Sequence, residues 1–135
     1  MDIADVMSEL AERLEMIDGW RVHASPPGTL VPPAVVVSYP EQIEFDRTYG
    51  RGADSMTLPV AAVVGKVVER STRDALAAYC AGAGPYSVKQ VLESGAYASF
   101  SVIRVAGIEF DVMSFNAVDY MAAIFTLQIL GAGSA

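Results

Sequence analysis

The sequence AVDYMAAIFTLQIL, residues 117–130, decides the fold of this chain. Read as a strand, it is apolar on both faces, because successive side chains of a strand point to opposite sides of the sheet. One face would hold Val118, Tyr120, Ala122, Ile124 and Leu130, and the other Met121, Ala123, Phe125, Leu127 and Ile129. A sheet built around such a strand needs cover on both faces.

The same run has other readings. A membrane span needs about 20 apolar residues, whereas this run is shorter and contains Asp119. A buried helix would fit the length, but the β-branched and aromatic residues favour a strand. Because three helical patterns suffice for one sheet face, we expect the second face to pack on another copy of the chain or on another protein. A strand covered wholly within one subunit is the alternative.

The composition indicates one acidic domain with many buried contacts. The chain has 135 residues, a formal net charge of -7 and a pI of about 4.5. One domain with its own core is expected, and a nucleic-acid-binding face, normally basic, is not. Apolar residues make up 53 % and charged residues 19 %, which indicates contacts between subunits. The single cysteine, Cys80, excludes an internal disulfide framework and a cysteine-rich zinc site.

Three segments show helical signals. Residues 1–17 are predicted as an N-terminal helix, because their apolar residues recur at steps of three and four. Two shorter helices are predicted from Ser71, with Asp74 completing a capping box, and from Ser87, with Gln90 in the same role. The first residues are acidic where a signal peptide would be basic, so we expect the chain to stay in the cytoplasm that makes it.

The remaining segments indicate strands. Short strands are predicted at residues 21–24 and 34–39, and a projecting hairpin at residues 43–64, with an edge or bulge where Pro59 removes a ladder donor. Three further strands, at 97–105, 108–114 and 117–130, form a meander, and residues 131–135 form a flexible tail. The predicted fold is a single α+β domain: an antiparallel or mixed sheet with two to three helices mainly on one face.

Few residues suggest chemistry. Glu109 and Asp111 share one strand face, and Asp119 is expected across from them, so three carboxylates could do acid-base work or hold a cation. An exposed acidic face explains the same residues more simply. His23 is read as a polar strand residue and Cys80 as a small core residue. Because no catalytic or nucleotide-binding motif is present, we expect no enzymatic activity, no cofactor and no metal site.

The central block YPEQIEFDRTYGRGADSMTLPVAAVVGKVVERSTRDALAAYCAGAGPYSVKQVLESG, residues 39–95, resembles a known family. It is similar to the tail terminator proteins of bacteriophages with long, non-contractile tails, particularly those that infect actinobacteria. The resemblance spans most of the chain, from the first helix to the last strand. Its motifs are structural: the TYGRG turn, the TLPV strand and the SVKQVLESG helix.

The resemblance implies a structural role in the virion. Tail terminators form a hexameric ring at the head-proximal end of the tail tube, stop its growth and dock the head-tail connector. The implied partners are further copies of the chain, the tube protein and a connector or stopper, while DNA passes through the lumen without specific binding. Assembly is expected in the host cytoplasm and final location in the neck of the virion. The candidate interface residues are Arg47, Tyr49, Arg51, Asp54, Tyr120, Phe125 and Leu127.

Two alternatives to a tail terminator remain. The first is a neighbouring neck component, a head-tail connector or stopper, because such proteins share size, composition and ring symmetry. The second is a small ligand-binding or enzymatic domain that uses the carboxylates of Glu109, Asp111 and Asp119. The position of the protein in the particle distinguishes a tail terminator from a neighbouring neck component. Loss of a ligand affinity when the three acids are replaced, with assembly intact, would favour the ligand-binding or enzymatic domain.

Overall fold

The computed structural model describes residues 2–17, 19–24, 33–45, 53–115 and 117–132. In this part of the chain it contains three helices and one six-stranded sheet. The helices are α1 (Ile3–Leu14), α2 (Arg70–Tyr79) and α3 (Val88–Glu93). The strands are β1 (Arg21–His23), β2 (Ala34–Val37), β3 (Gln42–Glu44), β4 (Ala53–Lys66), β5 (Val102–Phe115) and β6 (Val118–Ala132). The predicted α+β class with a mixed sheet is confirmed.

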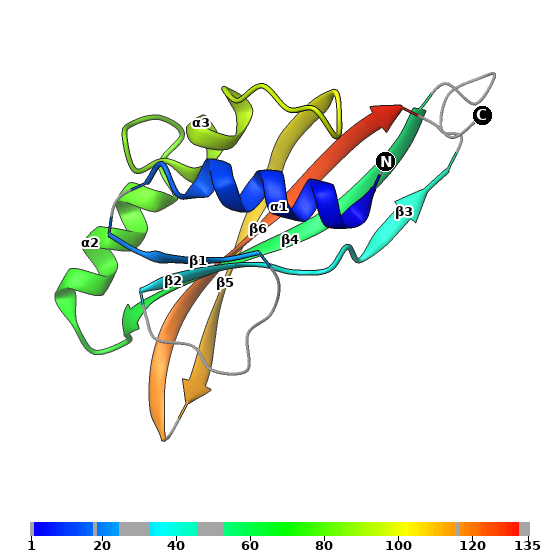
Figure 1. The fold of residues 1–135 in the computed structure, drawn as a ribbon. Helices are drawn as coiled ribbons and strands as arrows, with labels where there is room; N and C mark the ends of the chain where they lie inside the picture. The colour runs from blue at the N-terminus through cyan, green and yellow to red at the C-terminus, as the bar shows by residue number, and fades with distance from the viewer. Residues whose placement is uncertain (1, 18, 25–32, 46–52, 116, 133–135) are drawn as a thin grey trace.

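The sheet has the order β1-β2-β4-β6-β5, and β3 pairs with β4 beside β2 (Figure 1). β1 and β2 are parallel, and every other pair is antiparallel. β6 pairs with β4 from Lys66↔Tyr120 to Ala53↔Ala132, and with β5 on its other side. The two-sided apolar run at residues 118–130 therefore lies in an inner strand, and β5 lies at one edge of the sheet.

The core lies between the helices and one face of the sheet. On β6 this face carries Ala123, Phe125, Leu127 and Ile129, all fully buried, and on β4 it carries Met56, Leu58, Val60 and Ala62. Figure 1 shows α1 lying across this face, and α1 buries Val6, Leu10 and Leu14 against it. At one side of the core, Trp20 stacks on Tyr79 with ring centroids 4.5 Å apart.

The opposite face of the sheet carries none of the described helices, in agreement with the predicted one-sided arrangement. The register places Val63 opposite Ala122 on this face, and both side chains are fully buried. Val36, on the same face of β2, is also buried. The expectation that this whole face is left for another copy was therefore too broad, because its middle is already buried within the chain.

Pro59 lies in β4 at the break between β2 and β3. The carbonyl oxygen of Pro59 accepts a hydrogen bond from Ser38 N at 3.1 Å, and that of Thr57 accepts one from Glu41 N at 2.8 Å. The nitrogen of a strand residue points to the same side as its carbonyl, so the missing donor of Pro59 faces the residues between β2 and β3. The predicted irregularity at Pro59 thus takes the form of an interrupted neighbour.

The predicted meander was wrong in one respect. Residues 97–105 and 108–114 are not two strands, because β5 runs through Ala106 and Gly107 as one strand with a bulge between Val105 and Gly107. Tyr97 precedes the strand, and its hydroxyl donates to Leu92 O at 2.6 Å. A bulge adds one residue without reversing the chain, so the Ala106-Gly107 pair, which resembles a turn in sequence, stays inside the strand.

Two helix starts differ from their predicted capping boxes. α2 begins at Arg70 with Glu69 as N-cap and no side-chain cap bond, so the box of Ser71 and Asp74 was wrong. A backbone turn from Lys66 O to Glu69 N already begins the chain reversal there. In α3, Ser87 Oγ accepts from Gln90 N at 3.1 Å as predicted, but Gln90 Oε1 accepts from Gly84 N at 3.0 Å.

The other predicted boundaries hold in part. The N-terminal helix spans Ile3–Leu14, and its N-cap Asp2 accepts from Asp5 N at 3.1 Å. β3 and β4 form the predicted hairpin, whose tip at residues 46–52 lies outside the described residues. Of the predicted tail, residues 131 and 132 belong to β6, and residues 133–135 lie outside the described part.

Candidate interaction surface

The three carboxylates considered for chemistry do not converge. Glu109 and Asp111 pair with Ile124 and Ala122, so they lie on the face away from the helices. Asp119 pairs with Ser114 on the helix side, where its Oδ1 accepts from Ser114 Oγ at 2.6 Å. The expectation that Asp119 lies across from the other two acids was wrong. Within the described residues, no group of three or more His, Cys, Asp or Glu is placed to hold a metal ion.

Cys80 behaves as a core residue. It is the C-cap of α2, is half-buried and packs against the hydrophobic core, as predicted. Burial raises the pKa of its thiol, which reduces the thiolate fraction that a nucleophile needs. His23 lies half-buried in β1.

The predicted interface residues are scattered. Arg47, Tyr49 and Arg51 lie outside the described residues. Asp54 is only 3 % exposed. Tyr120 is half-buried on the face away from the helices. These positions therefore do not form one surface in the described part of the chain.

Phe125 and Leu127 are fully buried beneath the helices. Their assignment to an interface was wrong, because the helices cover the odd-numbered face of β6. Asp54 lies on the corresponding face of β4 and is also buried. A side chain in this layer can contact only its own chain.

Four exposed apolar residues of β5 and β6 were not predicted as contacts, and they fall into two pairs on opposite faces and in different halves of the strand pair. Val102 and Leu130 pair across the strands on the face away from the helices and are 54 % and 38 % exposed. Phe110 and Val112 lie on the helix side and are 58 % and 48 % exposed. Figure 1 shows that the hairpin extends beyond the helices. We call these four residues the hairpin apolar set.

The sequence contained part of the signal for this set. Ile108, Phe110 and Val112 alternate with Glu109, Asp111 and Met113, which indicates one apolar face. The alternation does not show whether a helix reaches that face. In the structure α3 contacts β5 near Val105, and no described helix covers Phe110.

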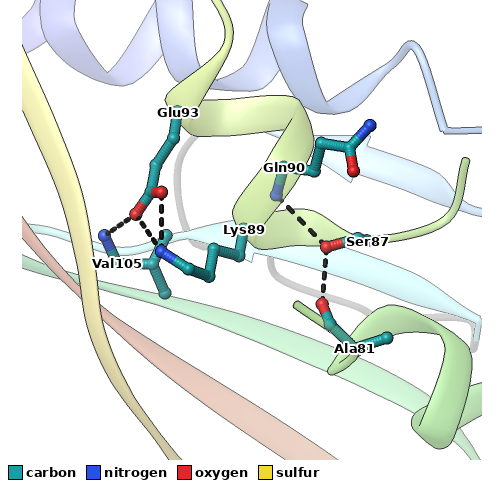
Figure 2. Close-up of polar contacts among 6 residues, drawn as sticks. All are labelled: Ala81, Ser87, Lys89, Gln90, Glu93 and Val105. Atoms are coloured by element: carbon teal, nitrogen blue, oxygen red, sulfur yellow. Dashed lines mark hydrogen bonds and ion pairs between the residues drawn. The ribbon is translucent and has the colours of Figure 1, made fainter. Parts of the chain in front are cut away.

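Glu93 of α3 forms a hydrogen bond with the backbone of β5 (Figure 2). Glu93 Oε2 accepts from Val105 N at 2.9 Å, and Glu93 Oε1 accepts from Lys89 Nζ at 2.6 Å. At the start of the helix, Ser87 Oγ donates to Ala81 O while it accepts from Gln90 N. The hydrogen bond from Lys89, followed by that from Val105, lowers the pKa of the Glu93 carboxyl.

This contact predicts an acid-dependent loss of stability. Because the pKa of Glu93 is lower in the folded chain than its ordinary value of 4.5, its stabilising effect is present above that value and is lost as the pH falls through the folded pKa. We expect the melting temperature of the wild type to fall more than that of Glu93→Gln between about pH 6 and about pH 3.

Thermal unfolding followed by circular dichroism checks this prediction. Glu109→Gln is the control, because it also removes one negative charge. Glu109 lies at an exposed position of β5, where its side chain makes no hydrogen bond with a described residue. Parallel pH curves for the wild type and Glu93→Gln would contradict the role of Glu93.

Two side chains of α1 form hydrogen bonds with the backbone of α3 and of the segment between α3 and β5. Glu9 accepts from Ala98 N at 3.0 Å and from Ser99 N at 2.9 Å. Arg13 Nε donates to Val91 O at 2.8 Å. An open hollow of about 310 Å³ beside α1 is lined by Asp5, Ser8, Glu9, Glu12, Ala98 and Ser99. Glu9 is engaged with the backbone there, so the hollow is explained as the rim of a helix contact.

A second hollow, of about 230 Å³, lies on the sheet face away from the helices. It is lined by residues of β3, β4, β5 and β6, among them Val102 and Leu130 of the hairpin apolar set. Arg104 Nη1 donates to Gln128 Oε1 at 3.2 Å across its floor. The hollow thus extends from the β5–β6 strand pair to β4 and β3.

Comparison with known proteins adds no relative. No protein-family model matches this sequence, and no curated protein matches it. None of the helices in the described part of the chain is long and apolar enough to cross a membrane.

Proposed function

We propose that this chain is a structural virion protein of the tail terminator type. In this role it forms a homo-oligomeric ring, a hexamer by resemblance, at the head-proximal end of a phage tail tube. The ring ends tube growth and provides the docking surface for the head-tail connector. The observation that carries the proposal is the hairpin apolar set, because it leaves large apolar side chains exposed on the edge strand β5 and on its neighbour β6.

Exposed apolar residues in a group favour contact with another protein. The hairpin apolar set occupies both faces of the strand pair, so a single flat contact cannot cover all four residues. A ring subunit has two different neighbours and contacts them through two different surfaces. The two-sided exposure of β5 and β6 therefore fits a subunit within a ring better than one half of a simple two-fold dimer.

The charge of the chain fits the same role. The formal net charge is -7, and an acidic ring repels DNA phosphates, so a genome can move through the lumen without binding. The proposed partners are neighbouring copies, the tail tube protein and the connector or stopper. The proposed role is structural, with no catalytic step and no cofactor, and its place is the neck of the virion.

The proposal predicts that one charge in the hairpin apolar set prevents assembly. We expect Val112→Asp to remain folded and to lose ring formation on tail tube ends, because the aspartate would be desolvated in the contact. Val68→Asp is the matched control, since Val68 is 91 % exposed and lies in the turn between β4 and α2.

Purified protein is mixed with the tube protein of its phage, and the products are examined by light scattering and electron microscopy. Wild type and Val68→Asp should cap tubes and stop their growth, while Val112→Asp should not. Capping by all three proteins would contradict a contact at the hairpin. In particles from a phage that lacks the gene, overlong tubes support termination, whereas tails of normal length beside unjoined heads place the protein in the connector or stopper.

A further inference from the structure

β5 forms an edge of the sheet along its whole length. It pairs with β6 and with no other strand of the described chain. An edge strand presents unpaired N–H and C=O groups, and these can pair with a strand from another molecule. The opposite edge is formed by β1 and β3, of three residues each, whereas β5 has 14. β5 is therefore the edge at which a strand of another molecule could form the most backbone hydrogen bonds.

Two amides of β5 donate to carboxylates. Val105 N donates to Glu93 Oε2 at 2.9 Å, and Val112 N donates to Asp111 Oδ1 at 2.8 Å. Neither is a ladder bond to β6, so both amides are donors that an incoming strand could otherwise use. The two amides lie on either side of the bulge between Val105 and Gly107, and a bulge itself interrupts regular pairing.

The segment between the two amides needs this protection. Phe110 and Val112 are exposed beside the edge, and β-rich apolar residues on an open edge promote association between chains. A hydrogen bond to an ionised carboxylate is stronger than one between neutral groups, so an incoming carbonyl must displace a better acceptor. Glu109 and Asp111 add negative charge that two copies would bring together.

We propose that Glu93 and Asp111 close the β5 edge against strand addition by a second copy of this chain. Glu93, from α3, accepts the hydrogen bond of Val105 N before the bulge. Asp111, from β5 itself, accepts that of Val112 N after the bulge. These two edge amides are then not available to a strand of another copy. The inference concerns the isolated chain and holds whether or not the chain forms a ring.

The test compares Asp111→Ala and the double variant Glu93→Ala/Asp111→Ala with wild type. In dilute protein, hydrogen exchange at Val112 should be about tenfold faster in both variants, because one charge-assisted hydrogen bond is lost. Exchange at Val105 should accelerate in the double variant alone. At high concentration the same amides should become protected, while sedimentation shows species of at least twice the monomer mass.

The control is Glu12→Ala/Glu15→Ala, which removes two charges from exposed positions outside β5 and leaves both carboxylate contacts in place. Wild type and control should show no concentration-dependent protection at Val105 or Val112. Unchanged exchange in dilute Asp111→Ala, absence of association in the variants, or equal association of the control would each overturn the proposal. If the double variant does not fold, Asp111→Ala decides the outcome, because Asp111 is an exposed residue of β5.

Discussion

Replacing Phe125 with alanine is expected to lower the free energy of unfolding by about 3–5 kcal/mol. Phe125 is fully buried in the layer between β6 and the helices, so the substitution removes apolar contact and leaves a cavity. A domain of this size is stable by about 5–15 kcal/mol, so a large share of its stability would be lost. Urea unfolding followed by circular dichroism measures the change.

Phe110→Ala is the matched control. It makes the same substitution in the neighbouring strand, where the ring is more than half exposed, and we expect a loss of less than about 1 kcal/mol. The proposed ring contact should respond in the opposite order, since Phe110 belongs to the hairpin apolar set. Equal losses of stability in the two variants would contradict the assignment of Phe125 to the core and of Phe110 to the surface.

Gly65→Ala is expected to destabilise the chain by about 1–3 kcal/mol. A Cβ atom at Gly65 would lie 2.6 Å from Thr72 Oγ1, and Thr72 is buried in α2. The substitution therefore forces α2 away from the end of β4. Thermal or urea unfolding of the variant measures the effect.

A double-mutant cycle shows whether this contact is the cause. Thr72→Ala removes the oxygen that a new Cβ would meet, so Gly65→Ala should cost less in the Thr72→Ala background than in wild type. Additive effects would show that the cost arises elsewhere at the end of β4, where the pairing with β6 shifts register between Val63 and Gly65. The cycle also tests the position of α2 relative to the sheet.

Local signals predicted the elements that depend on neighbours in sequence. The spacing of Val6, Leu10 and Leu14 predicted α1, because one face of a helix is set by residues three and four apart. Ser87 predicted the start of α3, since a cap acts within one helical turn. The alternation around Phe110 predicted a strand, and the pair Ala106 and Gly107 predicted an interruption, although its form was a bulge rather than a turn.

The candidate surface was harder to predict, because it depends on which residues the helices reach. α3 has six residues and packs near Val105, so the outer half of β5 is left exposed. Likewise, Asp119 and Asp111 fall on opposite faces because of the pairing across the β5–β6 hairpin. A change of one residue in that pairing would reverse the faces, and the pairing is set by the short connection at which Phe115 pairs with Val118.

The sequence by itself determined that residues 117–130 form a strand apolar on both faces, because composition and alternation are properties of the strand alone. It did not determine which face the helices cover. Both faces carry similar apolar residues, so the choice depends on contacts between distant segments. Only the tertiary structure placed Phe125 and Leu127 in the core, left the hairpin apolar set exposed, and brought Glu93 to the edge amide of Val105.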